Sequence, residues 1–311
     1  MKNYKILSIA LVALISIVAA CDSGENKETE AGVRYILISS EDGEQLEQGD
    51  FAIFSLRLLN SEDSVILDSK EIGELPVQID DSVLSRRGPL FSILKELKVG
   101  DSIKTKLTAT QIMTEGFQRP VSPDMEGSEK LTVFAKALNK FDTAGFMEWQ
   151  QQKRAEAISK MQKEAEKQKG IDDEIIQEYL TENSLEAQKT ESGIYYIITK
   201  EGTGEKPNKG DTVTVNYTGK LLNGTIFDSS KESVAKNANV FIERRDYRPY
   251  QIPIGEGQVI RGWDEGIMLL NEGAEATLII PSPLGYGPRA AGENLPANSI
   301  LVFDVELLDV K

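Results

Sequence analysis

Short runs of alternating apolar and polar residues, separated by Gly and Pro, fill residues 191–311 and limit what this region can fold into. Residues 212–217 alternate strictly, which is the period of a β-strand with one buried face. Asn223-Gly224 follows, and this pair favours a tight hairpin into the next strand. Residues 262–270 carry apolar side chains at helical spacing. The pattern predicts an α+β domain: a small antiparallel sheet wrapped around one short helix.

Two further regions precede this domain. Residues 32–141 again mix short alternating runs with turn residues, whereas residues 142–190 are rich in Gln, Lys, Glu and Ala. In the second of these regions, Ile158, Met161 and Ala165 share one face of a helix by spacing. We therefore predict that residues 142–190 form a helical linker.

Gly170 lies inside this linker, after Lys167 and Lys169, and the combination is typical of a helix end. Acidic residues 172–174 suit the start of a second helix, whose apolar face would carry Ile175, Ile176, Tyr179 and Leu180. Such a helix pair could clasp substrate or mediate dimerisation. The alternative is a spacer packed on a neighbouring domain.

The N-terminus has the pattern of an export signal in residues 1–20, with early lysines followed by an apolar run over 6–18. This run is short for a membrane-spanning helix. Residues 17–21 (IVAAC) resemble the lipobox of bacterial lipoproteins, which implies cleavage before Cys21 and lipidation of that residue. The alternatives are an uncleaved anchor or a plain secretory signal with a free thiol. Polar residues 21–31 predict a flexible tether.

These features predict a protein of the bacterial cell envelope, lipid-anchored to a membrane on its extracytoplasmic side. The pattern leaves open which membrane and which face carry it. Several lipid chains on one cysteine would hold a protein stably at a bilayer.

The composition excludes several function classes. The chain has no histidine and one cysteine, so a Ser-His-Asp triad, a thiol–imidazole pair and a cysteine-based zinc site are excluded. Its net charge of −15 argues against nucleic acid as a partner. We expect no metal and no cofactor.

A series of motifs in the last third resembles the FKBP family of peptidyl-prolyl cis/trans isomerases. The motifs occur in family order and with nearly family spacing, and their number in register makes the resemblance specific. They are Gly202-Thr203-Gly204, Gly210-Asp211, Tyr217-Thr218-Gly219, Phe227-Asp228-Ser229-Ser230, residues 259–266 (VIRGWDEG), Gly285-Tyr286-Gly287 and residues 301–307 (LVFDVEL). The resemblance implies an FKBP-type isomerase domain over residues 191–311.

The resemblance also implies an aromatic pocket for a proline ring. Trp263 would form its floor, and its walls would be Tyr217, Phe227, Tyr250 and Phe303. Val259 and Ile260 would line one side, Leu295 would add an apolar wall, and Asp228 would lie at the rim and orient the reacting amide. The Ile260 N–H and the Tyr286 hydroxyl would donate hydrogen bonds to substrate carbonyls.

Two segments depart from the family pattern. Residues 231–249 are longer than the usual connection and contain Arg244, Arg245 and Arg248. This insertion could shape substrate access or could be a solvated loop. In the loop 288–294, Ala291 stands where a bulky residue is often found, which puts substrate preference in doubt.

Residues 32–141 repeat the same order of motifs more faintly. Gly49-Asp50 parallels Gly210-Asp211, and residues 67–69 (LDS) parallel the Phe-Asp-Ser motif. Leu56 would align with Tyr217, Leu67 with Phe227, and no tryptophan matches Trp263. We interpret this region as a degenerate FKBP-like domain and predict that it is not an efficient isomerase; an unrelated α+β domain is the alternative.

The implied function is isomerisation of X-Pro bonds in exported proteins. Rotation of an amide bond needs no acid, base or metal, so this chemistry suits a chain without histidine. The partners would be proline-containing unfolded or partly folded proteins, and the chain could form a homodimer. The alternatives are an ATP-independent chaperone or binding module with incidental isomerase activity, and a structural subunit of an envelope assembly.

Overall fold

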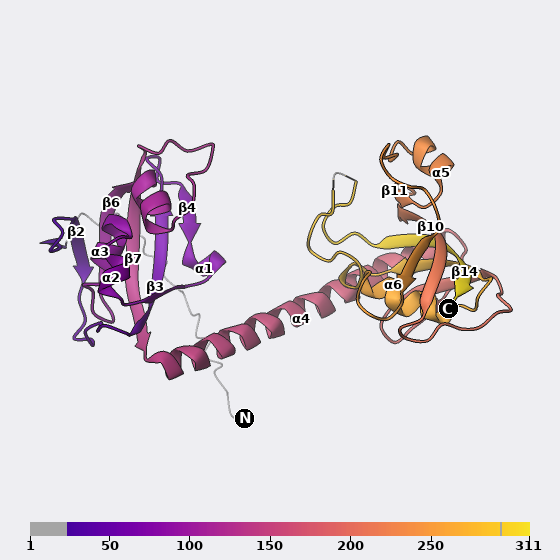
Figure 1. The fold of residues 1–311 in the computed structure, drawn as a ribbon, viewed down its shortest axis with the longest axis horizontal. Helices are drawn as coiled ribbons and strands as arrows, with labels where there is room; N and C mark the ends of the chain where they lie inside the picture. The colour runs from indigo at the N-terminus through magenta and orange to yellow at the C-terminus, as the bar shows by residue number, and fades with distance from the viewer. Residues whose placement is uncertain (1–23, 293) are drawn as a thin grey trace, which may run out of the picture. The chain divides into compact units, whose positions relative to one another are not determined.

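The computed structural model describes residues 24–292 and 294–311, which divide into two compact units. The first unit ends at Lys153, and the second is Arg154–Lys311 (Figure 1). The predicted signal 1–20 and Cys21 lie outside the described residues. Within the described residues, the structure contains no helix long and apolar enough to cross a membrane.

The first unit is a seven-stranded antiparallel sheet with short helices. Its strands are β1 Glu25–Glu28, β2 Arg34–Ser39, β3 Phe51–Leu59, β4 Val65–Asp68, β5 Leu75–Gln78, β6 Ser102–Thr108 and β7 Lys130–Phe141. Its helices are α1 Ser69–Ile72, α2 Asp81–Leu84, α3 Gly88–Leu94 and the π-helical turn η1 Thr110–Gly116. The strands are ordered β1-β2-β6-β7-β3-β4, and β5 pairs with the remaining part of β3.

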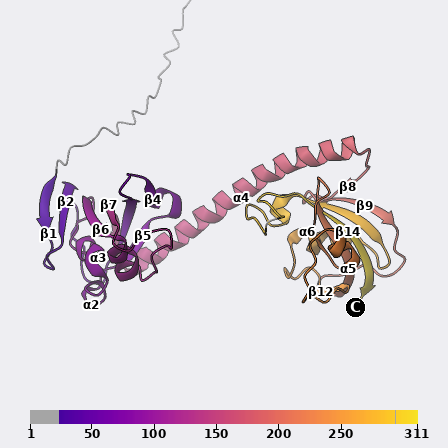
Figure 2. The same ribbon diagram turned by 90° about the horizontal axis from the view of Figure 1, so that it is seen from above.

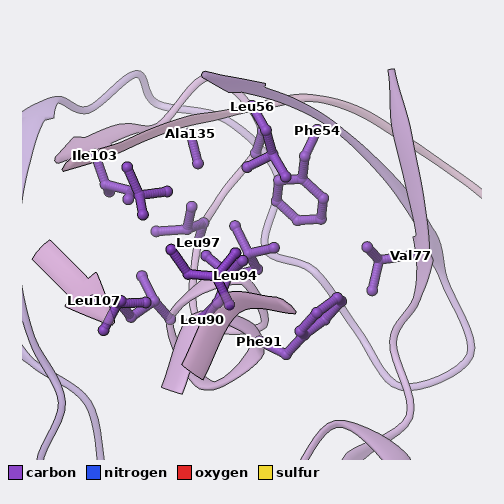
Figure 3. Close-up of a cluster of buried hydrophobic side chains, with 14 of the residues drawn as sticks. Phe54, Leu56, Val77, Leu90, Phe91, Leu94, Leu97, Ile103, Leu107 and Ala135 are labelled. Atoms are coloured by element: carbon purple, nitrogen blue, oxygen red, sulfur yellow. The ribbon is translucent and has the colours of Figure 1, made fainter. Parts of the chain in front are cut away.

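The core of this unit lies between α3 and the sheet. Leu90 and Leu94 of α3 lie between Leu56 of β3 and Ile103 of β6, and Phe91 of α3 lies on the side of Phe54 of β3 (Figure 3). Each of these side chains is at most 2% exposed. The alternating pattern of the strands supplies one apolar face, and the short helix covers it.

The predicted tether is wrong in part, because residues 25–28 form strand β1. Glu25 pairs with Leu37 and Glu28 with Arg34 in an antiparallel ladder. Thr29, which follows this strand, is buried. The polar composition suggested a flexible segment, but a ladder is made by backbone groups and needs no apolar side chains.

Helix α4, Thr143–Glu182, is continuous (Figure 2). The predicted break at Gly170 is therefore wrong. A glycine inside a helix costs only about 1 kcal/mol relative to alanine. The burial of Ile176 and Leu180 on the same helix outweighs this cost.

The predicted apolar faces of the linker behave differently. Ile158 and Met161 are 43% and 67% exposed, so the first of these faces is not buried. On the second face, Ile176 and Leu180 are buried, whereas Ile175 is 43% exposed. The C-terminal part of α4 therefore packs as part of a domain, whereas the middle part that carries Ile158 and Met161 stays in solvent.

The second unit is again a seven-stranded antiparallel sheet. Its strands are β8 Gln188–Lys189, β9 Tyr195–Lys200, β10 Thr212–Leu221, β11 Ile226–Ser229, β12 Tyr250–Pro253, β13 Glu275–Ile280 and β14 Leu301–Val310. Its short helices are α5 Glu232–Asn237, α6 Arg261–Gly266 and the 3₁₀ turns η2 Ile267–Leu269 and η3 Ser282–Leu284. The predicted α+β class with an antiparallel sheet around a short helix is confirmed at this level.

Both faces of this second sheet are covered. Trp263 and Ile267 pack with Phe303 in a large cluster on one face. On the other face, Ile176 and Leu180 of α4 form a smaller cluster with Ile279 and its neighbours. The C-terminal end of α4 is thus part of the second unit and packs against the back of the sheet that carries the aromatic cluster.

The two sheets have the same strand order. The second is ordered β8-β9-β13-β14-β10-β11, and β12 pairs with β10 as β5 pairs with β3. Even an irregularity recurs, because the register of the central pair shifts between Ile53 and Phe54 in one unit and between Thr214 and Val215 in the other. The shared register makes Leu56 the counterpart of Tyr217.

Candidate active site

A pocket of about 640 Å³ opens in the second unit beside α6. Nine of the ten predicted site residues line it, and Arg245 and Gln258 line it as well. Leu295 does not line it. That side chain is 4% exposed and packs within the core cluster of the unit. The structure therefore does not place Leu295 at the pocket wall, where it was expected.

The pocket floor is a cluster of aromatic rings packed edge to face around Trp263. Its ring centroid lies 5.0 Å from that of Tyr217 and 5.2 Å from that of Phe303, with interplanar angles of 84° and 80°. Phe227 packs on Phe303 in the same way, at 5.6 Å. Edge-to-face packing suits the ring quadrupoles and fixes the ring planes, so the walls are preorganised.

Gly219 makes room for this arrangement. A Cβ on Gly219 would lie 2.6 Å from Phe227 Cζ and 2.8 Å from Phe303 Cε1, closer than real Cβ contacts. The rings of Phe227 and Phe303 can therefore meet above β10 only because Gly219 has no side chain. The motif Tyr-Thr-Gly thus supplies one ring and the space for two others.

Asp228 is the centre of a hydrogen-bond network at the rim. The Tyr217 hydroxyl donates to Asp228 Oδ2 at 2.6 Å, and the Ser229 N–H donates to Oδ1 at 2.8 Å. Arg245 pairs with the same carboxylate through Nη1, and its Nη2 donates to the Tyr217 hydroxyl at 2.7 Å. The carboxylate is thereby held in one orientation with its charge balanced by the guanidinium.

Arg245 is the functional candidate whose role the sequence left undecided. The signal was a cluster of arginines in an acidic chain, close after the Phe-Asp motif, and it allowed either pocket access or a solvated loop. The structure divides the cluster: Arg245 reaches the pocket, whereas Arg244 and Arg248 are exposed. The guanidinium also lies 5.2 Å from the Tyr247 ring centroid, which fixes the insertion to the rim.

The two tyrosines of the pocket keep their protons over a wide pH range. Burial, together with the hydrogen bond to Asp228, raises the pKa of Tyr217 well above its ordinary value. Burial and the nearby negative charge of Asp228 also raise the pKa of Tyr286. Both hydroxyls therefore remain hydrogen-bond donors at neutral pH.

The side of the pocket with Val259 and Ile260 is built by a loop that Asp264 holds. Asp264, buried in α6, accepts hydrogen bonds from the N–H groups of Gly255 and Gly257, each at 2.8 Å. Within the described part of the chain, the Ile260 N–H makes no hydrogen bond. A free N–H on a pocket wall can donate to a bound carbonyl.

Ser229 and Ser230 join β11 to β10 behind the pocket. The Tyr217 N–H donates to Ser230 Oγ at 2.9 Å, and Ser229 Oγ donates to the Tyr217 carbonyl at 3.0 Å. Both serines are fully buried. This pairing sets the position of the strand that carries Phe227 and Asp228.

The matching positions of the first unit hold aliphatic residues. The strand register places Leu56, Leu75 and Val133 where the second unit has Tyr217, Tyr250 and Phe303. Leu58 takes the place of Gly219 and is 1% exposed. Its side chain fills the space that Gly219 leaves open for aromatic rings in the second unit.

The register also corrects one pairing between the two regions. In the first unit, Arg57 lies opposite Asp68 and Leu58 opposite Leu67, so Leu67 corresponds to Asp228 rather than to Phe227. The Leu56 N–H donates to Ser69 Oγ at 2.8 Å, as the Tyr217 N–H does to Ser230. The acidic group at the rim therefore has an aliphatic counterpart.

A comparison with known proteins places residues 203–308 in a described family, the FKBP-type peptidyl-prolyl cis-trans isomerases. The chain is 38% identical over 164 residues to the probable FKBP-type peptidyl-prolyl cis-trans isomerase FkpA of Neisseria meningitidis. That match covers 53% of this chain and 54% of the relative. A crystal structure of FkpA from Escherichia coli is 32% identical, with a TM-score of 0.37, and the match covers 56% of this chain and 75% of that one.

The coverage differs among relatives. The chain spans about half the length of the FKBP-type isomerases from Neisseria, Haemophilus and Aeromonas. It is also 42% identical over 119 residues to FK506-binding protein 1 of Dictyostelium discoideum, across 38% of this chain and 99% of that relative. With nearly a whole relative matched at this identity, and with the aromatic pocket inside the matched region, the chain belongs to the family of FKBP-type peptidyl-prolyl cis-trans isomerases.

Proposed function

We propose that this protein isomerises X-Pro peptide bonds in exported proteins, with the pocket around Trp263 as its active site. The observation that carries the proposal is the set of edge-to-face rings that Gly219 allows in a pocket of about 640 Å³. An apolar pocket with aromatic walls suits the compact apolar ring of proline. The substrates are proline-containing chains that are unfolded or partly folded.

The chemistry follows from the electronic structure of the amide. Resonance keeps the peptide bond planar, with a rotation barrier of about 18–20 kcal/mol. In the twisted transition state this resonance is lost, and with it the charge separation that water stabilises. An apolar aromatic site that excludes water therefore favours the twisted form over the planar one. No bond to the substrate is made or broken.

The polar groups of the pocket orient the chain during rotation. The Ile260 N–H and the Tyr286 hydroxyl donate to substrate carbonyls on either side of the proline. Asp228, held by Tyr217 and Arg245, presents a fixed negative charge at the rim. Preorganised charges of this kind need no rearrangement when the bond rotates.

The test is catalysis of cis/trans exchange in a short proline-containing peptide by the full chain. Phe227→Ala is expected to reduce kcat/KM by about 10- to 100-fold, because it removes one wall and admits water. Phe134→Ala, the same change in the first unit, serves as the matched control and should leave the rate unchanged. If the wild-type protein does not accelerate the exchange above the uncatalysed rate, the proposal is rejected.

A second candidate function is ATP-independent binding of unfolded chains. It is favoured by the exposed apolar side chains of Met147, Ile158 and Met161 along α4. Suppression of aggregation by the full chain carrying Phe227→Ala would establish this activity separately from isomerisation. The triple change of the three exposed residues to Gln should then abolish it.

The location of the protein is a proposal from the N-terminal sequence alone. Lipidation of Cys21 would anchor it on the extracytoplasmic side of a bacterial membrane. Labelling with a radioactive fatty acid should mark the wild-type chain and not Cys21→Ser. A homodimer, if it forms, would be detected by sedimentation of the mature chain at several concentrations.

A further inference from the structure

Helix α4 brings one buried carboxylate, Asp172, into the second unit. Asp172 is only 1% exposed. Burying a carboxylate costs free energy unless its oxygens accept hydrogen bonds. Oδ2 accepts from the Ser282 N–H at 2.6 Å, and Oδ1 accepts from the Gln168 side chain at 2.8 Å. Within the described residues, no Lys or Arg pairs with it. The carboxylate is therefore held by its contact with the backbone of the isomerase unit.

The residue that Asp172 contacts controls a turn at the pocket. Ser282 opens the 3₁₀ turn η3, and its carbonyl accepts from the N–H of Gly285 at 3.0 Å and of Gly287 at 2.8 Å. These two glycines flank Tyr286, which lines the pocket. Ser282 thus binds α4 through its N–H and both neighbours of Tyr286 through its carbonyl.

The helix is a firm support for this contact. Ile176, one turn after Asp172, is fully buried against Ile279 and Val302 on the back of the sheet. Leu180 continues the same face and is 9% exposed. The packing of α4 on the sheet therefore holds the backbone that carries the carboxylate, and the hydrogen bond to Ser282 links this backbone to the turn.

We propose that Asp172 is a positioning residue for Tyr286, so that α4 is a working part of the isomerase and more than a linker. By fixing Ser282, the carboxylate sets the backbone of the turn, and the turn sets where the Tyr286 hydroxyl enters the pocket. The proposal rests on the isomerase function proposed above. The proposal gives α4 a role in positioning Tyr286, and the sequence around Asp172 gives no sign of this role.

The first test is kinetic and uses the full chain. Asp172→Ala is expected to lower kcat/KM for peptide isomerisation by about fivefold to tenfold, the range expected when a support at some distance from the substrate is removed. In a Tyr286→Phe background, the same substitution should have little further effect, because its influence passes through that hydroxyl. An equal loss in both backgrounds would overturn the proposal.

Asp173→Ala is the matched control. This neighbouring carboxylate also ties α4 to the second unit, through the Tyr195 hydroxyl at 2.7 Å and Lys189, but it does not touch the turn. It should reduce stability against urea without changing kcat/KM of the folded protein. If the two alanine variants lower kcat/KM equally, the role of Asp172 is only structural.

The second test does not depend on activity. Hydrogen–deuterium exchange of residues 281–287 should become about tenfold faster in Asp172→Ala and stay unchanged in Asp173→Ala. Unchanged protection would overturn the inference even if the wild type catalyses isomerisation. Faster exchange in Asp172→Ala would support the inference even if the wild type does not catalyse isomerisation.

A conservative variant covers the case in which Asp172→Ala does not fold. Asp172→Asn keeps one acceptor oxygen of the same size but loses the charge. It should therefore give exchange rates and kcat/KM values between those of the wild type and the alanine variant. Wild-type values of both quantities in the Asn variant would contradict a role for the carboxylate charge.

Discussion

At the scale of single residues, the pocket depends as much on Gly219 as on the aromatic rings themselves. The rings of Phe227 and Phe303 occupy the space where any other side chain at this position would lie. The first unit has Leu58 at the corresponding place and packs it into its core. The residue at this position is thus one of the differences between the open pocket and the filled one.

We predict that Gly219→Ala displaces both rings and lowers kcat/KM by about tenfold or more, since a shift near 1 Å can cost this much. Catalysed exchange in a proline peptide measures the effect. Lys220→Ala is the control: this neighbouring side chain pairs with Asp304 and does not line the pocket. If Gly219→Ala keeps the activity of the wild type, the contact between the Phe227 and Phe303 rings is not needed for catalysis.

The pH profile tests the two pocket tyrosines. Because the pKa values of Tyr217 and Tyr286 are raised, we expect kcat/KM to stay flat from about pH 6 to pH 9, below the ordinary tyrosine pKa near 10. The stabilising contribution of Tyr217 is fully present below this ordinary pKa and is lost as the pH rises toward its higher value in the folded protein. A rate that declines with a midpoint below pH 9 would contradict this assignment.

Tyr217, Trp263 and Phe303 line the pocket where the family resemblance implied an aromatic pocket. Periodicity alone located the strands and the helix that carry them, and it did not show that their rings meet. Asp172 and Asp264 were not identified, because each acts on a backbone group that lies elsewhere in the fold. Such contacts depend on tertiary packing and leave no periodic signal.

At the scale of elements, α4 shows how packing overrides local preference. Gly170 and the acidic residues 172–174 favoured a break between two helices. The helix continues because Ile176 and Leu180 are buried on the sheet and Asp172 is held by Ser282. Strand β1 is the converse case, since its polar composition gave no sign of the ladder that its backbone forms.

The continuous helix predicts that Gly170→Ala stabilises the second unit by about 0.5–1 kcal/mol. A Cβ at Gly170 meets nothing within 4 Å, so only the helix preference changes. Urea unfolding followed by Trp263 fluorescence, in a Trp149→Phe background, would report the second unit alone.

Gly193→Ala is the control with the opposite sign. Gly193 has φ +102°, which an alanine adopts only with strain, and its Cβ would lie 2.7 Å from Lys169 Cε. We expect this variant to be less stable than the wild type. Destabilisation by Gly170→Ala would mean that the helix is interrupted at this position.

At the scale of the whole molecule, two sheets of the same strand order differ in what they enclose. One surrounds an aromatic pocket, and the other has Leu56, Leu58 and Val133 at the corresponding positions, all fully buried. We propose that the first unit is a related domain whose pocket has been filled. Its isomerase activity should therefore be negligible.

The full chain with Trp263→Leu tests this proposal. The substitution removes the aromatic floor of the pocket, and catalysis should fall to the uncatalysed rate. Since the first unit is untouched, any isomerisation that remains can be assigned to it once Phe227→Ala is added. A residual rate that survives both changes would show that the first unit is catalytic.

The long exposed stretch of α4 has a consequence for how the protein would be cut by proteases. Residues 150–164 are exposed, and an isolated helix of about this length is only marginally stable in water. Local opening there should therefore expose the backbone well before either unit unfolds. The stretch lies between Trp149, which packs on Phe141, and Asp172, so cleavage would leave the C-terminal product with its own buried helical segment. The natural end of the isomerase unit is thus inside the helix, some way before the first strand of its sheet.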